Sequence, residues 1–334
     1  MTKKTEQSRA RTGGAAGKSR APLWRWGAGA GVAAAAMGAA AYRNVKRARE
    51  AERLNPPEGK FVTIDGVRLH YVERGSGPLI VLLHGNGTTS SDWFASGVAE
   101  RLTGSNRVIA FDRPGFGYSE RPRSRIWTPA AQAKLIAAAL AELGEGPATV
   151  VGHSFATLVG VSLALDHRDA VSSLVLLGGY FYPTIRADVP FVAPPAIPLI
   201  GDAMRYTISP LIGSALKSHM ETKMFAPAPV AQGWLDEFPF EMTLRPSQIR
   251  AEAAEAGIMV PAAAAVAGRF EEIALPVTII AGAGDEIVET ASQSERLAEA
   301  VPGSKLVVVE GAGHMVHYTA TARVSDAIRS AAAG

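Results

Sequence analysis

The feature that most constrains the fold is a set of short, unbroken apolar runs in the chain after residue 78. These runs are rich in β-branched residues and show no polar alternation, which is typical of strands buried on both faces. Six are evident, over residues 79–83, 108–111, 149–151, 174–177, 277–281 and 306–309. Helical stretches separate several of them, among them 130–143 and 292–300. We therefore expect an α/β fold with a mostly parallel sheet covered by helices.

Two further segments adjust this picture. Residues 61–64 and 67–73 flank Asp65-Gly66, a pair that suits a tight turn, and they predict a hairpin. Residues 180–270 hold 11 of the 21 prolines, which disfavours long central strands although many apolar residues there still require burial. We expect a core formed by residues 58–179 and 271–334, with a helical cap inserted at 180–270.

The N-terminal region differs in composition from the rest of the chain. Residues 1–25 form a basic leader, and residues 26–42 carry no charge and are mostly Ala and Gly between aromatic residues. We expect a single membrane anchor over 26–42, a linker over 43–57 and a membrane location. A cleaved secretory signal, with a secreted product, and an Ala-rich helix or leader of a cytoplasmic protein are the alternatives. Asn55-Pro56-Pro57 then marks the start of the folded domain.

Charge and cysteine content exclude several classes of function. The net charge is +3, but 12 of the 34 Lys and Arg residues fall in the first 53 positions, against only three acidic residues there. The folded part is therefore net acidic, which argues against a nucleic-acid partner. With no cysteine, the chain has no thiol nucleophile, no thiolate zinc site and no disulfide.

The strongest local motif runs from Val150 to Ala156, with the sequence Val-Val-Gly-His-Ser-Phe-Ala. A strand enters a helix there through a turn of small residues, and such a turn exposes the hydroxyl group of Ser154. The motif resembles the nucleophile elbow of the α/β-hydrolase superfamily, although Ala156 replaces the last glycine. The resemblance extends from about Phe61 to the C-terminus and implies the eight-stranded sheet of that superfamily.

The same resemblance suggests the partners of Ser154, since the superfamily orders its triad as Ser, then Asp or Glu, then His. Asp285 and His314 each follow a predicted strand in a Gly-rich loop that resembles the superfamily's acid and histidine loops. Glu286 is a rival for the acid. His317 is a weaker candidate as a metal partner, and we expect it to start a helix or line a pocket because no further ligand cluster is evident.

Stabilisation of an oxyanion needs two backbone amides. We expect them from Phe155 and from Asn86, because 84–87 resembles the superfamily's oxyanion loop. Residues 112–119 match a superfamily stretch that shapes a tight loop near the pocket. Ser154 occupies the position where haloalkane dehalogenases and epoxide hydrolases need a carboxylate, so these activities are not expected.

The sequence therefore predicts a serine hydrolase with catalytic Ser154, Asp285 and His314 and with no cofactor and no metal. A carboxylic ester or lipid-like acyl compound is the expected substrate, because an apolar cap would cover an apolar pocket. Carbon–carbon bond hydrolysis, perhydrolysis and acyl transfer on the same fold are alternatives, as is a binding module without catalysis. The sequence does not indicate the oligomeric state.

Overall fold

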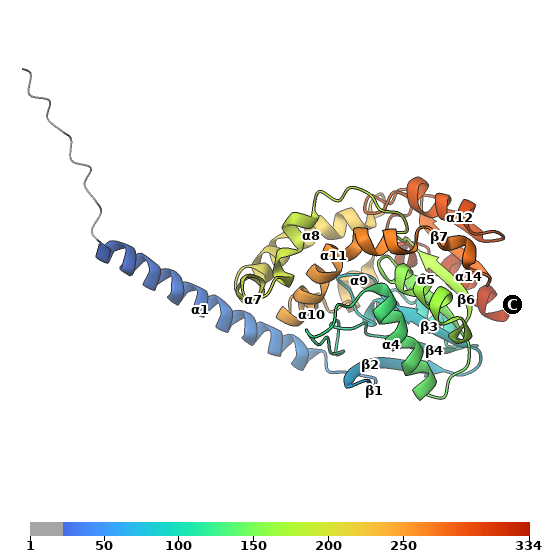
Figure 1. Ribbon diagram of the computed structural model, residues 1–334, viewed down its shortest axis with the longest axis horizontal. Coiled ribbons are helices and arrows are strands. Elements are labelled where there is room, and N and C mark those ends of the chain that lie inside the picture. The colour runs from blue at the N-terminus through green and yellow to red at the C-terminus, as the bar shows by residue number, and fades with distance from the viewer. Residues whose placement is uncertain (1–22) are drawn as a thin grey trace, which may run out of the picture. The chain divides into compact units, whose positions relative to one another are not determined.

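The centre of the protein is a single eight-stranded sheet, seen in a computed structural model that describes residues 23–334 (Figure 1). The strands lie in the order β1-β2-β4-β3-β5-β6-β7-β8. Their bounds are β1 (Lys60–Ile64), β2 (Val67–Gly75), β3 (Leu79–Leu83), β4 (Arg107–Phe111), β5 (Ala148–His153), β6 (Val171–Leu177), β7 (Val277–Gly282) and β8 (Lys305–Val309). All six apolar runs form strands, which confirms the predicted α/β class.

The strand directions also follow the prediction. β1 pairs with β2, and β2 with β4, in antiparallel register, whereas β4, β3, β5, β6, β7 and β8 pair in parallel. Asp65 and Gly66 turn the β1–β2 hairpin with φ of 50° and 75°, the positive values that a two-residue hairpin turn requires. In a parallel sheet all carboxyl ends of the strands meet at one edge, so loops after β3, β5, β7 and β8 come together there.

Helices cover both faces of the sheet because successive strand residues point to opposite sides. In β5, Val150 packs into the core under α4 (Pro129–Glu142) and α5 (Ala156–Asp166). Val151 packs into the core on the other face, together with Val324 and Ile328 of α14 (Thr321–Ala333). Two smaller helices, α3 (Val98–Leu102) and α12 (Arg296–Ala300), add to opposite faces.

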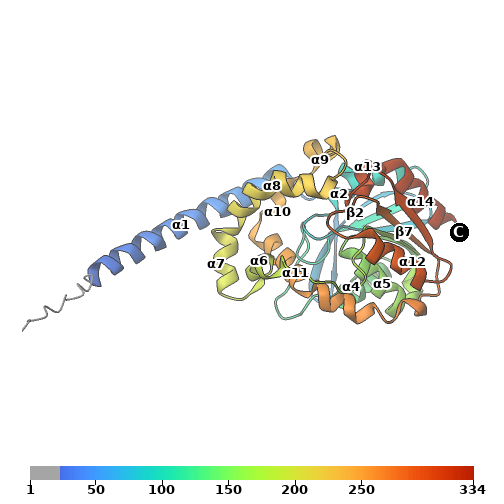
Figure 2. The ribbon, with the colours of Figure 1, turned by 90° about the horizontal axis from the view of Figure 1, so that it is seen from above.

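The proline-rich segment between β6 and β7 forms helices and no strand within the described residues. Figure 2 shows α6, α7 and α8 at one end of the sheet, far from the C-terminus. The helices are α6 (Val189–Val192), α7 (Ile200–Tyr206), α8 (Ser209–Phe225), α9 (Gln232–Glu237), α10 (Phe240–Thr243) and α11 (Pro246–Val266), with short 3-10 turns at Pro194–Ala196 and Phe270–Glu272. We keep the name cap for residues 180–270. That the cap acts as a lid over a pocket remains a prediction.

The N-terminal part departs from what the sequence suggested. The chain divides into two compact units, Met1–Ala39 and Ala40–Gly334, and one helix, α1 (Leu23–Leu54), begins in the first and ends in the second. Residues 43–54 of the expected linker lie in this helix, and residues 55–57 follow its end. Within the second unit, the Asn44 side chain is buried and donates hydrogen bonds to the cap carbonyls of Tyr206 and Thr207.

The membrane anchor expected over residues 26–42 is a wrong prediction. Among helices in the described part of the chain, none is both long enough and apolar enough to cross a membrane. The segment does lie in a helix, but Ala and Gly contribute little hydrophobicity, and charged residues follow from Arg43 onward. The transmembrane assignment and the membrane location inferred from it are withdrawn. Of the predicted basic leader, residues 1–22 lie outside the described residues.

Candidate active site

Ser154 lies at the corner between β5 and α5, where the chain turns sharply. Its φ is 54°, a left-handed value that residues with side chains seldom adopt and that costs about 1–3 kcal/mol. Gly152 permits the turn, because a Cβ atom there would lie 2.7 Å from the carbonyl oxygen of Ala156. The Ser154 amide donates to the carbonyl of Leu177 at the end of β6, which fixes the corner to the sheet. The backbone therefore has the strained geometry of a nucleophile elbow.

The structure brings Ser154, His314 and Asp285 into one hydrogen-bonded line. His314 Nε2 lies 3.0 Å from Ser154 Oγ, and His314 Nδ1 lies 2.8 Å from Asp285 Oδ2. The second oxygen of Asp285 accepts the amides of Ile287 and Val288 at 2.8 and 2.9 Å, so the carboxylate is held in place. Glu286, the rival acid, is exposed and makes no hydrogen bond to His314.

The two expected oxyanion donors also lie close to this corner. Gly85 packs against the elbow so tightly that a Cβ atom there would lie 3.3 Å from Ser154 Cβ and 2.9 Å from His153 Nδ1. Asn86 follows Gly85, and Phe155 follows Ser154. Among the described residues, neither the Asn86 amide nor the Phe155 amide donates a hydrogen bond to another protein group. Both amides therefore remain available to an acceptor at the site.

A buried ion pair supports the expected oxyanion loop, residues 84–87, through hydrogen bonds to its carbonyl groups. Arg113 and Glu255 are fully buried and paired through both guanidinium nitrogens, at 2.6 and 3.0 Å. The same guanidinium donates to the carbonyls of His84 (2.7 Å) and Gly85 (3.0 Å). These hydrogen bonds to the His84 and Gly85 carbonyls fix the orientation of the peptide groups between β3 and Asn86. Glu255 belongs to α11, so the cap contributes directly to this orientation.

His84 is a neutral structural residue in this network. Its Nε2 accepts the Arg113 amide at 2.9 Å, which places the proton on Nδ1, and Nδ1 donates to the Gly85 carbonyl at 2.8 Å. Burial, together with the charge of Arg113, lowers the pKa of His84 to about 4. With a neutral ring and both nitrogens hydrogen-bonded, His84 links the end of β3 to the Arg113 backbone.

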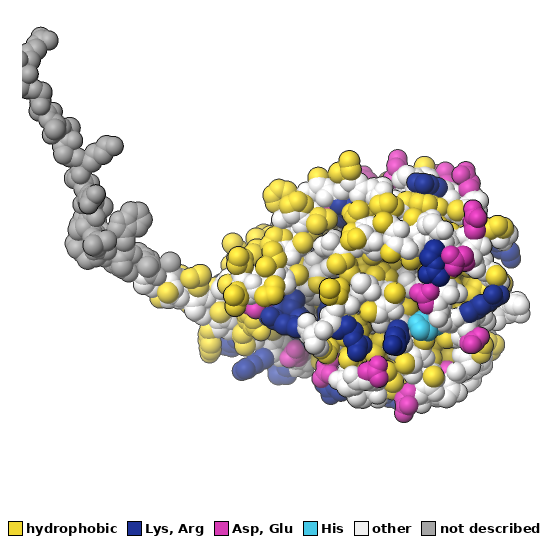
Figure 3. All heavy atoms as spheres, viewed as in Figure 1, with side chains coloured by type: hydrophobic (Ala, Val, Ile, Leu, Met, Phe, Trp, Pro, Cys, Tyr) yellow, Lys and Arg dark blue, Asp and Glu magenta, His cyan; other side chains and the backbone are white. Residues whose placement is uncertain are grey.

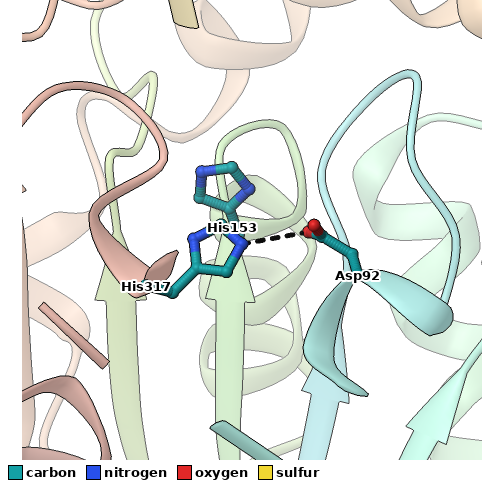
Figure 4. Close-up of side chains that lie close together, drawn as sticks. All are labelled: Asp92, His153 and His317. Carbon is teal, nitrogen blue, oxygen red and sulfur yellow. Dashed lines mark hydrogen bonds and ion pairs between the residues drawn. The ribbon is translucent and has the colours of Figure 1, made fainter. Parts of the chain in front are cut away.

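Three buried side chains behind the elbow form a cluster that the sequence did not reveal. Figure 4 shows the His153 and His317 rings close together, with the Asp92 carboxylate facing His317. His317 Nε2 lies 3.2 Å from Asp92 Oδ2, and the His153 ring packs against both His317 and His314, at 4.5 and 4.9 Å between centroids. Burial and the neighbouring histidines lower the pKa of His153 well below its usual value. His317 is wholly buried and lies in the first turn of the short helix α13 (Val316–Thr319).

This cluster is the group of described residues that could hold a metal ion. One ligand atom from each of Asp92, His153 and His317 lies within 4.8 Å of the others. Asp92 and His153 are thus potential ligands beside His317 that were not evident in the sequence. Two of the three groups are already joined by the Asp92–His317 hydrogen bond, and Asp92 also accepts the hydroxyl of Tyr318 at 3.0 Å. The carboxylate thus has protein partners without a metal.

The sequence matches the alpha/beta hydrolase family over residues 80–327. The chain belongs to this family. An uncharacterized protein from Mycobacterium tuberculosis is 31% identical over 300 residues, covering 86% of this chain and 83% of the relative. A 2-hydroxymuconate semialdehyde hydrolase from Pseudomonas putida is 33% identical over 128 residues, covering 38% of this chain and 46% of that enzyme.

A solved structure shows the same fold over most of this hydrolase-family chain. It is a hydrolase from Pseudomonas aeruginosa with a TM-score of 0.66 and 23% identity, covering 83% of this chain and 99% of the other. At this identity the likeness shows the fold alone. The matched residues 80–327 begin in β3 and include the elbow, both later loops and the cap.

Sequence reasoning missed the residues of this α/β hydrolase that support the site from a distance. Arg113 stood inside a recognised stretch, but its partner Glu255 is 142 positions further along, in a cap helix without a motif. Asp92 and His317 are separated by 225 positions. A signal was present in each case, since Glu255 is an acidic residue within an Ala-rich helix and His317 stood close to the predicted histidine. Neither signal indicated that Glu255 would pair with Arg113 or that His317 would bond to Asp92.

Proposed function

We propose that this α/β hydrolase is a serine hydrolase that cleaves carboxylic esters with apolar acyl groups through an acyl-enzyme. The observation that carries the proposal is the line Ser154 Oγ, His314 Nε2, His314 Nδ1 and Asp285 Oδ2, with steps of 3.0 and 2.8 Å. Serine is a weak nucleophile unless a base takes its proton, and this geometry provides the base and a carboxylate that orients it.

In the proposed reaction, Ser154 Oγ attacks the ester carbonyl as His314 Nε2 accepts its proton. The negative charge then develops on the carbonyl oxygen, where the amides of Asn86 and Phe155 can donate to it. Asp285 keeps His314 Nδ1 protonated and stabilises the imidazolium. His314 next protonates the leaving alcohol, and water, activated by His314, releases the acid from Ser154. Every proton passes through His314 Nε2.

The apolar acyl preference rests on the cap. Its residues between β6 and α11 include many large apolar side chains, several of them packed around Phe225 and Trp234 beside Met315, the residue after His314. An apolar wall next to the reacting groups favours an apolar acyl chain over a charged one. In this proposal the cap covers the acyl pocket.

A substrate series tests the proposal directly. The purified protein is assayed with p-nitrophenyl acetate, butyrate, octanoate and palmitate, with Ser154→Ala as the control for background hydrolysis. We expect kcat/KM to rise from acetate to octanoate in the wild type and to fall to background in Ser154→Ala. Equal rates for the two proteins would contradict the proposal, and a steady decrease from acetate onward would contradict the apolar pocket.

Carbon–carbon bond hydrolysis by the same residues is the second candidate. The match to the Pseudomonas putida 2-hydroxymuconate semialdehyde hydrolase, although confined to 38% of this chain, supports keeping it. A vinylogous 1,5-diketone assayed by loss of its visible absorbance distinguishes the two. Turnover of the diketone without turnover of any ester would favour the second candidate.

A further inference from the structure

A surface cavity beside the cap helix α11, on the side away from the oxyanion loop, is lined by four arginines. It has a volume of about 190 Å³ and lies between residues 121–127, the 3-10 turn at Pro194–Ala196 with Pro198, and α11. The arginines are Arg121, Arg123, Arg125 and Arg250, and none of the lining residues is acidic. In Figure 3, Lys and Arg side chains gather around the chain that precedes α4 and the adjoining cap. We call this cavity the arginine pocket.

The positive charges of the arginine pocket are only partly neutralised. Arg123 pairs with Asp202, a residue that also pairs with Arg205. Arg121 lies 3.5 Å from Glu255, whose carboxylate is already paired with Arg113. Within residues 23–334, no carboxylate lies within 4.0 Å of the guanidinium groups of Arg125 or Arg250. Asp202 and Glu255 are thus the carboxylates paired with arginines of this region, and they are shared among Arg113, Arg121, Arg123 and Arg205.

Burial and neighbouring positive charges lower the pKa of the two least exposed arginines, Arg121 and Arg250. Burial, together with the charges of Arg113 and Arg250, lowers the pKa of Arg121 to about 10, although the Glu255 carboxylate opposes this shift. Burial and then the charges of Arg123 and Arg205 also lower the pKa of Arg250. Like charges held together in a partly buried place favour the binding of an opposite charge.

The remaining walls of the arginine pocket are apolar. Ile126, Trp127 and Ile258 line it together with small residues and prolines, and Ile126 is 75% exposed. The guanidinium of Arg125 lies over the Trp127 ring, 5.1 Å from its centre, in a cation–π contact with that wall. An inorganic anion alone would leave these walls in water, whereas an anion with a short apolar body would cover them.

The arginine pocket is separate from the candidate active site. Arg250, Ala254 and Ile258 recur every fourth residue and so share one face of α11. Glu252, two residues after Arg250, lies on another face and packs against the oxyanion loop, 3.6 Å from a Cβ placed on Gly87. The pocket and the loop therefore lie on different sides of the same helix.

We propose that the arginine pocket binds a small organic anion in which a carboxylate or phosphate group is joined to a short apolar body. Arg250, whose guanidinium donates to the carbonyl of Arg121, and Arg125 supply charges that no carboxylate of residues 23–334 neutralises. The planar guanidinium groups suit the paired oxygens of such a head group. Trp127 and Ile258 cover the apolar body. This site does not depend on the esterase proposal, because its test measures binding only.

Calorimetric titration of the full-length protein at low ionic strength tests the proposal. The probes are hexanoate, phenyl phosphate, inorganic phosphate and, as an uncharged match, hexanamide. We expect hexanoate or phenyl phosphate to bind, with the stronger of the two identifying the head group, and hexanamide to bind at least about tenfold more weakly, since each charge-assisted hydrogen bond lost corresponds to about that factor. Inorganic phosphate should bind more weakly than phenyl phosphate.

Variants connect the binding to the named residues. The double variant Arg125→Gln/Arg250→Gln should weaken binding at least about tenfold. Arg168→Gln is the matched control, because the Arg168 guanidinium also bonds a backbone carbonyl, that of Ala274, and does not line the pocket. If the double variant does not fold, Arg125→Gln alone serves, since Arg125 only stacks on Trp127. Equal affinity in the wild type and the variants, equal affinity for hexanamide, or no binding of any anion would overturn the proposal.

Discussion

Replacing Glu252 by glutamine should make the protein more stable at alkaline pH. The Glu252 side chain is exposed, its carboxyl group packs beside Gly87, and among the described residues it forms no ion pair or side-chain hydrogen bond. Burial, together with the charge of Glu255, raises the pKa of Glu252 from 4.5 to about 7. The folded protein therefore favours the neutral form of this carboxyl group.

The direction of the pH effect follows from proton binding. Between pH 4.5 and pH 7 the folded protein holds the Glu252 proton and the unfolded chain does not, so the free energy of unfolding falls as pH rises through this window. The full shift would correspond to about 3 kcal/mol. Because the side chain keeps exposed surface, solvent screening reduces this, and we expect about 1 kcal/mol.

Chemical denaturation at pH 4.5 and pH 8 measures this effect. Glu252→Gln cannot ionise, so its stability relative to the wild type should increase by about 1 kcal/mol between the two values. The control is Glu142→Gln, which removes an exposed carboxylate from α4 and should leave the pH dependence unchanged. If Glu252→Gln and the wild type lose stability in parallel between pH 4.5 and pH 8, the carboxyl group is not held neutral and the reasoning is refuted.

Three further substitutions test the arrangement around Ser154. Asp285→Asn should lower kcat by about 10⁴-fold at unchanged stability, because the amide can no longer fix the proton on His314 Nδ1; a loss below tenfold would argue against the role of Asp285. Gly85→Ala should lower kcat at least about tenfold, because the added methyl group would lie 2.9 Å from His153 Nδ1 and displace the oxyanion loop; an unchanged kcat would show that the loop position does not matter. Arg113→Met should lower the free energy of unfolding by about 3 kcal/mol, since the buried Glu255 carboxylate loses its two-bonded partner and keeps only the longer contact to Arg121. Adding Glu255→Met should restore part of that loss in denaturant titrations, and a still less stable double variant would contradict the explanation.

The sequence predicted the sheet because buried strands have a local pattern, and the resemblance to the α/β-hydrolase superfamily selected the triad residues from the loops after these strands. An apolar run without alternation identifies a buried strand, and the residues directly after such runs meet at one edge of a parallel sheet. Ser154, Asp285 and His314 each follow a run of this kind, so their proximity needed no knowledge of side-chain packing. The hairpin turn at Asp65-Gly66 was likewise a local signal.

The features that escaped prediction depend on contacts between distant segments. The pairing of Arg113 with Glu255 requires α11 to pack behind the oxyanion loop, and nothing in either segment specifies that contact. The Asp92–His153–His317 cluster joins three elements across the sheet edge. At the N-terminus, a charge-free segment suggested an anchor, but the helix continues past Tyr42 to Leu54, and Asn44 packs against the cap. Composition alone did not distinguish the two outcomes.

The central claim, that Ser154 is an activated nucleophile, is tested most directly by covalent labelling. The wild type and Ser154→Ala are incubated with a fluorophosphonate probe, and the modified residue is mapped by peptide mass spectrometry. Labelling of Ser154 in the wild type and none in Ser154→Ala is the expected result. An unlabelled wild type under conditions where a control serine hydrolase reacts, or labelling that persists in Ser154→Ala, would contradict the claim.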